Sequence, residues 1–282
     1  MPKKVTFLVG FNLFILPAIA FFIAMLASPG GVSGAFLLMP VQISLLGVTS
    51  PVANATNLAY NIIAIPSGIQ RFRKERRFVF PLALSIILGS IPGAFIGALI
   101  RIKFLLDPRP FKFFVGLVLI CLGLRLILIK RRKVDAVTDV QIRYMSFKKV
   151  IFFFAHKEFS FSPVIIFLLV LFTGTVSGAY GIGGGALLSP ILISVFFLPP
   201  HAIASSTLAG TFTTSIMGVC FYYMLGYSPN WRVAILFGIG GMLGMYVGAR
   251  TQKYIPERAI KFILAILIFV PALKYIFSYF LQ

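Results

Sequence analysis

Two glycine-rich segments are the residues of this chain with the clearest capacity for chemistry. They are 28–34 (SPGGVSG) and 177–185 (SGAYGIGGG). Glycine permits backbone turns that a Cβ would block, so backbone N–H groups there can approach a bound molecule. The short apolar segment after each one is expected to begin a helix, whose N-terminus carries free N–H groups and partial positive charge. Together the two segments predict an anion site built from backbone donors.

Small polar side chains follow each glycine-rich segment and strengthen this hypothesis. Asn54, Asn57 and Asn61 recur at the spacing of one helix face. Hydroxyl residues occupy the matching turns of the second half, and amides and hydroxyls donate hydrogen bonds to an oxyanion without a fixed charge. The predicted substrate-binding residues are Gly30, Gly31, Ser33, Gly34, Gln42, Asn54, Thr56, Asn57, Gly181, Gly183, Gly184, Gly185, Ser205, Ser206 and Thr207.

Each of these features also has a purely structural interpretation, which the sequence leaves open. Glycines in membrane helices often allow close packing, and the asparagines can join neighbouring helices to each other. Packing is the favoured interpretation for Gly93, Gly97, Gly244 and Gly248. His201, which follows two prolines, is expected to cap a helix or lie at an interface rather than relay protons.

The charge distribution places these segments in a membrane. Hydrophobic residues make up 59% of the 282 residues and charged residues only 11%, whereas soluble proteins typically carry about 25% charged residues. No charged side chain occurs between Lys4 and Arg71, or between Glu158 and Arg232. Each stretch is long enough for about three crossings of about 20 residues. The first apolar run continues far beyond a cleavage position, which argues against a signal peptide.

The positions of the charged residues and the absence of catalytic motifs disfavour several classes of function. The net charge of +20 comes from Lys and Arg clustered at the ends of apolar runs, a pattern of cytoplasmic loops rather than of nucleic-acid binding. All six carboxylates fall in loops or at helix ends, so the acidic membrane residue common in proton- or cation-coupled carriers is missing. No nucleotide loop, metal motif or nucleophile–base pair occurs, and we expect no enzyme activity, catalytic residue, metal or cofactor. Cys121 and Cys220 are expected to be buried packing residues rather than a disulfide.

The same unit occurs twice in the chain. Segment 31–40 aligns with 181–190, then 53–56 with 204–207, each about 150 residues apart. Each half has an apolar helix, a glycine-rich break, a short apolar segment, a helix with small polar residues, and two further apolar helices. We expect an all-α integral membrane protein with roughly eight to ten membrane segments. The expected parts are membrane repeat 1–130, a basic, partly helical cytoplasmic linker 131–160, and membrane repeat 161–282.

The distribution of basic loops predicts that the two halves have opposite orientations. Loops 71–77, 130–157 and 250–258 are basic and expected to be cytoplasmic, whereas the uncharged loop 226–230 is expected outside. Corresponding loops then face opposite sides, and both termini lie outside. Inverted-topology repeats of this kind, with broken or re-entrant helices meeting near the midplane, are common among secondary transporters.

At these residues the chain resembles the TauE/SafE family of sulfite-exporter-like permeases. The resemblance depends on the two breaks, each followed by a proline (Pro40 or Pro190), and on segments 53–57 (ANATN) and 204–207 (ASST). It covers nearly the whole chain. It implies a multi-pass protein of the cytoplasmic membrane that exports or takes up a small sulfur-containing anion, such as sulfite or an organosulfonate. Pro29 and Ser33 stand where the second break has more glycine, a difference that would shape selectivity.

Three functions therefore stay open at this point. The first is a secondary transporter of a small anion, the second an anion channel that uses the same breaks, and the third a membrane scaffold without transport. The expected partners are a small anionic substrate and the lipid bilayer, with no nucleic acid. The sequence leaves open whether copies of the chain form a homo-oligomer.

Overall fold

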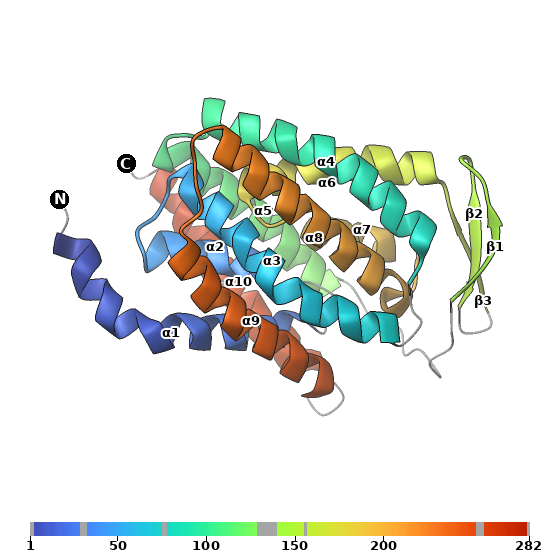
Figure 1. Ribbon diagram of the computed structural model, residues 1–282, viewed down its shortest axis with the longest axis horizontal. Helices are drawn as coiled ribbons and strands as arrows, with labels where there is room; N and C mark the ends of the chain where they lie inside the picture. The colour runs from blue at the N-terminus through green and yellow to red at the C-terminus, as the bar shows by residue number, and fades with distance from the viewer. Residues whose placement is uncertain are drawn as a thin grey trace.

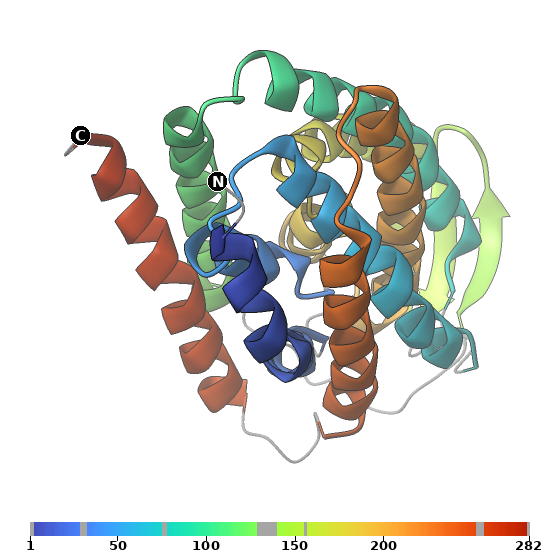
Figure 2. The same ribbon diagram turned by 60° about the vertical axis from the view of Figure 1, so that its left-hand side comes forward.

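Long apolar helices dominate the fold, as the sequence predicts. The computed structural model describes residues 3–28, 33–74, 78–128, 140–154, 157–251 and 257–280, and these form ten helices and three strands (Figures 1 and 2). The first half contains α1 (Lys3–Ala27), α2 (Ala35–Ser44), α3 (Pro51–Lys74), α4 (Phe80–Lys103) and α5 (Pro108–Leu128). The second half contains α6 (Pro163–Tyr180), α7 (Gly185–Ser194), α8 (Pro200–Met224), α9 (Trp231–Thr251) and α10 (Glu257–Phe280). Each half thus has one ten-residue helix, α2 or α7, directly after its glycine-rich break.

Local sequence explains where several helices begin. Pro81, Pro163 and Pro200 lie in the first turns of α4, α6 and α8, where the missing N–H costs no helical hydrogen bond. The helix α4 continues to Lys103, three residues beyond the apolar run 78–100 of the sequence. Arg101, the first charged residue after that run, consequently lies in the last turn of α4.

The first helix of each half packs against the fourth helix of the other half, and glycines allow these helices to approach closely. The helix α1 packs against α9 of the other half, and α6 packs against α4. A Cβ on Gly93 or Gly97 of α4 would lie 2.7 or 2.2 Å from a backbone oxygen of α6. A Cβ on Gly244 or Gly248 of α9 would lie 2.2 or 2.3 Å from a backbone oxygen of α1. The packing interpretation of these four glycines is therefore confirmed, since only a hydrogen fits between such backbones.

A small β-sheet replaces the partly helical linker expected between the halves. Strands β1 (Gln141–Met145), β2 (Val150–Phe154) and β3 (Lys157–Phe161) form an antiparallel sheet in the order β1-β2-β3. The expectation of helix was wrong for these residues because β2 alternates buried and half-buried side chains, a period of two that suits a strand. Its buried phenylalanines pack with Val79 and Leu82 of the α4 region. The sheet stands at the end of the bundle away from both chain termini (Figure 1).

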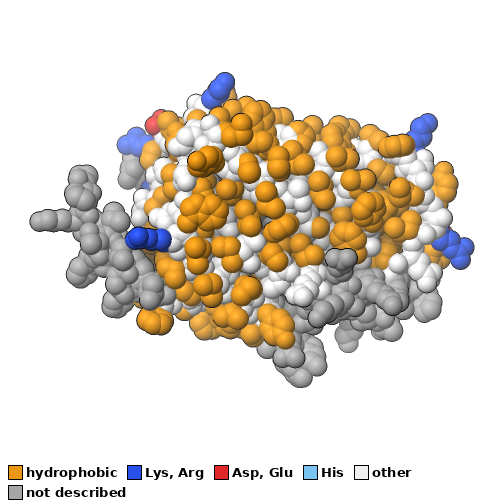
Figure 3. All heavy atoms as spheres, in the orientation of Figure 1, with side chains coloured by type: hydrophobic (Ala, Val, Ile, Leu, Met, Phe, Trp, Pro, Cys, Tyr) orange, Lys and Arg blue, Asp and Glu red, His pale blue; other side chains and the backbone are white. Residues whose placement is uncertain are grey.

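The outer surface of the bundle is apolar between two polar ends. Figure 3 shows hydrophobic side chains across the face of the bundle, with Lys and Arg toward its two ends. Among the described residues, four helical segments are long and apolar enough to cross a membrane: Phe80–Lys103, Pro163–Tyr180, Ala202–Met224 and Trp231–Gly248. This distribution is typical of a protein that crosses a bilayer several times.

The two cysteines lie on this outer surface. Cys121 and Cys220 are both free and exposed, so the expectation that they are buried was wrong, whereas the expectation that they form no disulfide is confirmed. A thiol is tolerated on an apolar surface because it behaves as a small hydrophobe.

The close approach of α4 to α6 generates a first prediction. Gly97→Val places a Cβ against the backbone oxygen of Thr175, so we expect the free energy of unfolding in detergent to fall by about 1–3 kcal/mol through overpacking. The matched control is Ile96→Val, because Ile96 is 41% exposed on the outer surface. An unchanged denaturation midpoint for Gly97→Val would contradict the tight contact.

Candidate functional site

The second glycine-rich break is a left-handed turn that packs directly on α3. Helix α6 ends where Gly181 adopts φ +81°, and Gly183 adopts φ +77° before α7 begins. The N–H groups of Gly181 and Ile182 both donate to the carbonyl oxygen of Ser177, at 2.7 and 3.1 Å, which closes the end of α6. A Cβ on Gly181 would lie 2.7 Å from Cα of Asn54. Glycine is required there by both the positive φ and the close approach.

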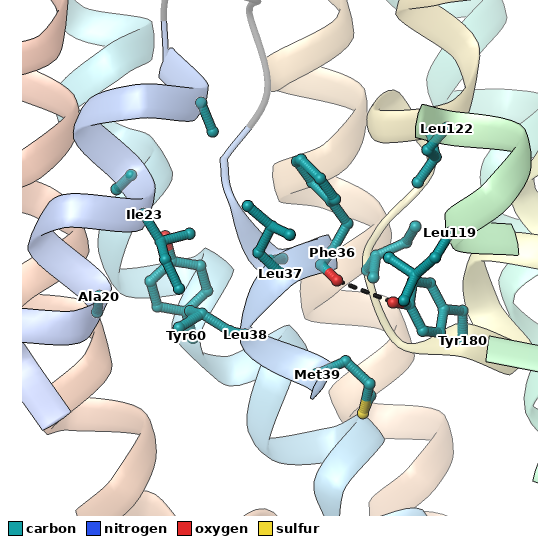
Figure 4. Packing of buried hydrophobic residues seen from close by; sticks show 14 of the residues in the cluster. Ala20, Ile23, Phe36, Leu37, Leu38, Met39, Tyr60, Leu119, Leu122 and Tyr180 are labelled. Atoms are coloured by element: carbon teal, nitrogen blue, oxygen red, sulfur yellow. Dashed lines mark hydrogen bonds between the residues drawn. The ribbon is translucent and has the colours of Figure 1, made fainter. Parts of the chain in front are cut away.

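The first break ends in the same way. Gly34 adopts φ +84° immediately before α2, and the Ser33 hydroxyl accepts a hydrogen bond from the N–H of Ala35 at 3.4 Å. The predicted residues Gly30 and Gly31 lie outside the described residues. Helix α2 begins inside the bundle, where Phe36, Leu38 and their neighbours are buried (Figure 4). Both short helices therefore start in the protein interior, where the sequence predicts anion-binding N-termini.

The asparagine face of α3 holds the two breaks together. The Asn57 amide donates to the carbonyl oxygen of Ala35 at 2.9 Å and to that of Gly181 at 2.8 Å, so one side chain joins the start of α2 to the second break. Its oxygen accepts a hydrogen bond from Gln42 at 3.3 Å. Asn54 donates to the carbonyl oxygen of Ala179 at 2.8 Å. The bonds to Ala179 and Gly181 satisfy backbone oxygens at the end of α6 that lack helical partners, whereas Ala35 lies in the first turn of α2 and receives the amide as an additional donor.

The hydroxyl residues of α8 occupy several environments. Thr211 accepts a hydrogen bond from the N–H of Gly185 at 2.9 Å and so caps the first turn of α7. Thr207 accepts one from Ser189 of α7 at 3.1 Å. Ser206 instead donates to the carbonyl oxygen of Val79 at 3.0 Å, on the side of the α4 start. Only part of the predicted hydroxyl set thus contacts the second short helix.

All predicted polar site residues that the structure describes are buried. They are Ser33, Gln42, Asn54, Thr56, Asn57, Ser205, Ser206 and Thr207. Thr56 lies away from the breaks: its hydroxyl donates to Val52 and accepts the N–H of Asn230 at 2.9 Å. The break in the second half is instead surrounded by Asn54, Asn57, Thr211 and the neighbouring Asn61.

Two buried polar atoms beside the second break have no hydrogen-bond partner among the described residues: Oδ1 of Asn61 and Oγ of Ser177. Both residues bond to Ile182 of the break. The Asn61 amide donates to the Ile182 carbonyl oxygen at 3.0 Å, and the Ile182 N–H donates to the Ser177 carbonyl oxygen. Buried polar atoms are usually paired. The break therefore retains both an unused acceptor and an unused hydroxyl.

Three tyrosines outside the predicted set also bind the breaks. Tyr60 donates to the carbonyl oxygen of Ser33, and Tyr222 donates to that of Gly178 at 2.9 Å. Tyr180 of α6 donates to that of Phe36 in α2 at 2.8 Å, as Figure 4 shows. A phenol in an otherwise apolar helix is the sequence feature that points to them, because a buried hydroxyl seeks a partner.

The bridging role of Asn57 generates a second prediction. Asn57→Ala removes the amide bonds to Ala35 and Gly181 and leaves the Gly181 carbonyl oxygen, which lies outside a helix, without its donor, at a cost of about 1–3 kcal/mol for that unsatisfied group. We expect a correspondingly lower midpoint in an SDS unfolding titration. Ser67→Ala is the control, because Ser67 is half-buried on the same helix and donates to Ala64 within that helix. Equal midpoints for both variants would refute the bridge.

Comparison with known proteins places this arrangement in a family. Residues 16–275 match the family model described as "Sulfite exporter TauE/SafE". The chain is 24% identical over 232 residues, 82% of each chain, to "Probable membrane transporter protein YunE" of Bacillus subtilis. It is 26% identical over 270 residues, 91% of this chain and 96% of the relative, to "Probable membrane transporter protein y4hK" of Sinorhizobium fredii.

A plant relative carries the family name itself. "Sulfite exporter TauE/SafE family protein 3" of Arabidopsis thaliana is 34% identical over 108 residues, which are 37% of this chain and 22% of the relative. No solved structure matches the chain. Because the family match extends from α1 to α10 and includes both glycine-rich breaks, the chain belongs to the TauE/SafE sulfite exporter family and is a multi-pass membrane transporter.

Proposed function

We propose that this protein is a secondary transporter, a permease, that moves a small sulfur-containing anion such as sulfite or an organosulfonate across the cytoplasmic membrane. The family description, sulfite exporter, supports the class of substrate. The curated bacterial relatives support the transport of a solute in general terms, since they are named probable membrane transporters.

The observation that supports an anion path most directly is the convergence of the two breaks. Helices α2 and α7 both begin in the interior, and Asn57 contacts the start of one and the turn before the other. Two helix N-termini would add partial positive charge at one place. The unpaired Ser177 hydroxyl beside the second break supplies a donor for an oxyanion. The predicted residues of both breaks, including Gly30 and Gly31, would line this path.

We further infer that the halves are inverted repeats that rock against each other to give alternating access. Supporting this, α1 relates to α9 as α6 relates to α4, with glycines at matching positions. In Figure 1, α1 begins at the end of the bundle away from the sheet, whereas α6 begins beside the sheet. Opposite starting ends are what inverted topology requires. Arg143 in β1 and Lys148 and Lys149 in the β1–β2 turn favour a cytoplasmic position for that end.

Transport assays test the function with a matched pair of glycine variants. Purified protein in liposomes should show saturable flux of labelled sulfite or a sulfonate. Gly183→Ala should reduce that flux at least tenfold, because the residue has φ +77° and its Cβ would lie 2.6 Å from Thr211. Gly47→Ala is the control: it has φ +66°, hence similar backbone strain, but no described atom lies within 4 Å of its Cβ position.

The outcomes of this assay separate the candidate functions. Absence of saturable flux for every sulfur anion tested would overturn the proposal. Unitary currents in a planar bilayer would identify an anion channel, since a carrier turns over too slowly to produce them. Equal flux for Gly183→Ala and Gly47→Ala would show that the second break does not line the transport path.

Labelling of single cysteines tests the orientation. In a background with Cys121 and Cys220 replaced by alanine, Ser146→Cys in the β1–β2 turn and Ser228→Cys before α9 are made separately. A membrane-impermeant maleimide applied to intact cells should label Ser228→Cys and should label Ser146→Cys only after permeabilisation. Labelling of both from the outside would refute the proposed topology.

A further inference from the structure

A buried arginine near the second break has no acidic partner among the described residues. Arg101 in the last turn of α4 has 0% of its surface exposed and is the only charged residue among the buried residues that the structure describes. The two carboxylates whose side chains are described, Asp107 and Glu158, are both exposed. A buried cation is costly unless it is paired. An arginine in this environment therefore has a strong electrostatic preference for an anion.

The partners of the guanidinium group among the described residues are neutral. Its Nε donates to Oδ1 of Asn54 at 3.0 Å, and its terminal nitrogens donate to the carbonyl oxygens of Leu105 and Thr49. The Cζ atom of Arg101 lies 3.6 Å from the centre of the Phe111 ring. Carbonyl dipoles and an aromatic face lower the cost of the buried charge but do not neutralise it. A guanidinium has five N–H donors, and three of them have partners here.

Helix capping alone does not explain this burial. A cation near a helix C-terminus interacts favourably with the carbonyl end of the helix. Lys103 belongs to the same last turn, and it is exposed to solvent. The exposed Lys103 can therefore interact with the carbonyl end of α4 while it stays hydrated, so this interaction does not require the burial of Arg101.

Asn54 connects this charge to the second break. Its oxygen accepts from Arg101 while its amide donates to the carbonyl oxygen of Ala179 at 2.8 Å, two residues before Gly181. The other two partners lie in the connections α2–α3 and α4–α5. In Figure 1 the C-terminal end of α4 lies at the end of the bundle away from the sheet. The guanidinium therefore lies between that end of the bundle and the break.

We propose that Arg101 is a substrate-binding residue that provides the fixed positive charge of the anion path on the side away from the sheet. The inference depends on the proposed function and assigns a charged ligand to the same path. The flat, forked guanidinium suits an oxyanion with two adjacent oxygens, such as sulfite or a sulfonate group, and would discriminate against a spherical halide. Asn54 acts beside it by orienting the guanidinium at Nε.

The test compares substitutions in one turn of α4, with Lys103→Gln as the control. In liposomes, Arg101→Gln should raise the KM for sulfite at least tenfold, and Arg101→Lys should lie between Arg101→Gln and wild type because it retains charge without the fork. Lys103→Gln should leave the KM unchanged within about twofold. Protection of each protein against thermal unfolding by sulfite, with chloride as the comparison ion, measures binding independently of flux.

A second variant keeps the test informative if Arg101→Gln does not fold. Asn54→Asp places a carboxylate against Nε of the intact arginine, which neutralises the local charge while keeping the guanidinium paired. This variant should also lose sulfite protection. A purely structural arginine would instead lower Vmax and melting temperature in both Arg101 variants with an unchanged KM, and that result would overturn the assignment.

The wild-type result distinguishes the two levels of the proposal. Wild-type protein without saturable flux or protection by any sulfur anion would overturn the proposed function and Arg101 as its ligand together. Wild-type flux with an unaltered KM in Arg101→Gln would leave the transporter intact and overturn the role of Arg101 alone.

Discussion

A peptide group inside a lipid bilayer must find its hydrogen-bond partner within the protein, because the hydrocarbon offers none. Two turns of this chain interrupt the helical hydrogen bonding that usually meets this requirement, at Gly34 and at Gly181–Gly183, where glycines adopt left-handed backbone conformations. The Asn57 amide joins the two turns, with one bond to Gly181 in the second turn and one to Ala35 directly after the first. Asparagine is suited to this place because its amide has two donors and one acceptor, and carries no charge.

Close contacts between helices of different halves accompany this hydrogen-bonded arrangement. The glycines of α4 and α9 allow backbone approach that no other residue would permit. In a bilayer, helices gain little from burying apolar side chains against one another, since lipid is equally apolar. Direct backbone packing and buried hydrogen bonds therefore have a larger share in holding α1 to α9 and α6 to α4.

The electrostatic character of the interior follows from its composition. Asparagines, hydroxyls and tyrosines supply most of the buried polar groups, and Arg101 is the buried charge among the described residues. An interior with a net positive charge and many neutral donors is poorly suited to cations. The sequence predicted an anion site of backbone N–H groups, amides and hydroxyls, and the structure adds a buried arginine to the same interior.

The sequence by itself determined the helices, the two breaks and the correspondence between halves. Apolar runs of bilayer length, prolines at helix starts and glycines at breaks are local features, and Gly93, Gly97, Gly244 and Gly248 followed from their spacing. Only the tertiary structure decided which apolar side chains face lipid and which face the interior, because both environments are apolar; Cys121 was misjudged for this reason. The sheet formed where helix was expected because β2 packs onto the start of α4. The partners of Arg101 come from Thr49, Asn54, Leu105 and Phe111. These residues lie in separate parts of the chain, so no local sequence pattern predicts that they contact Arg101.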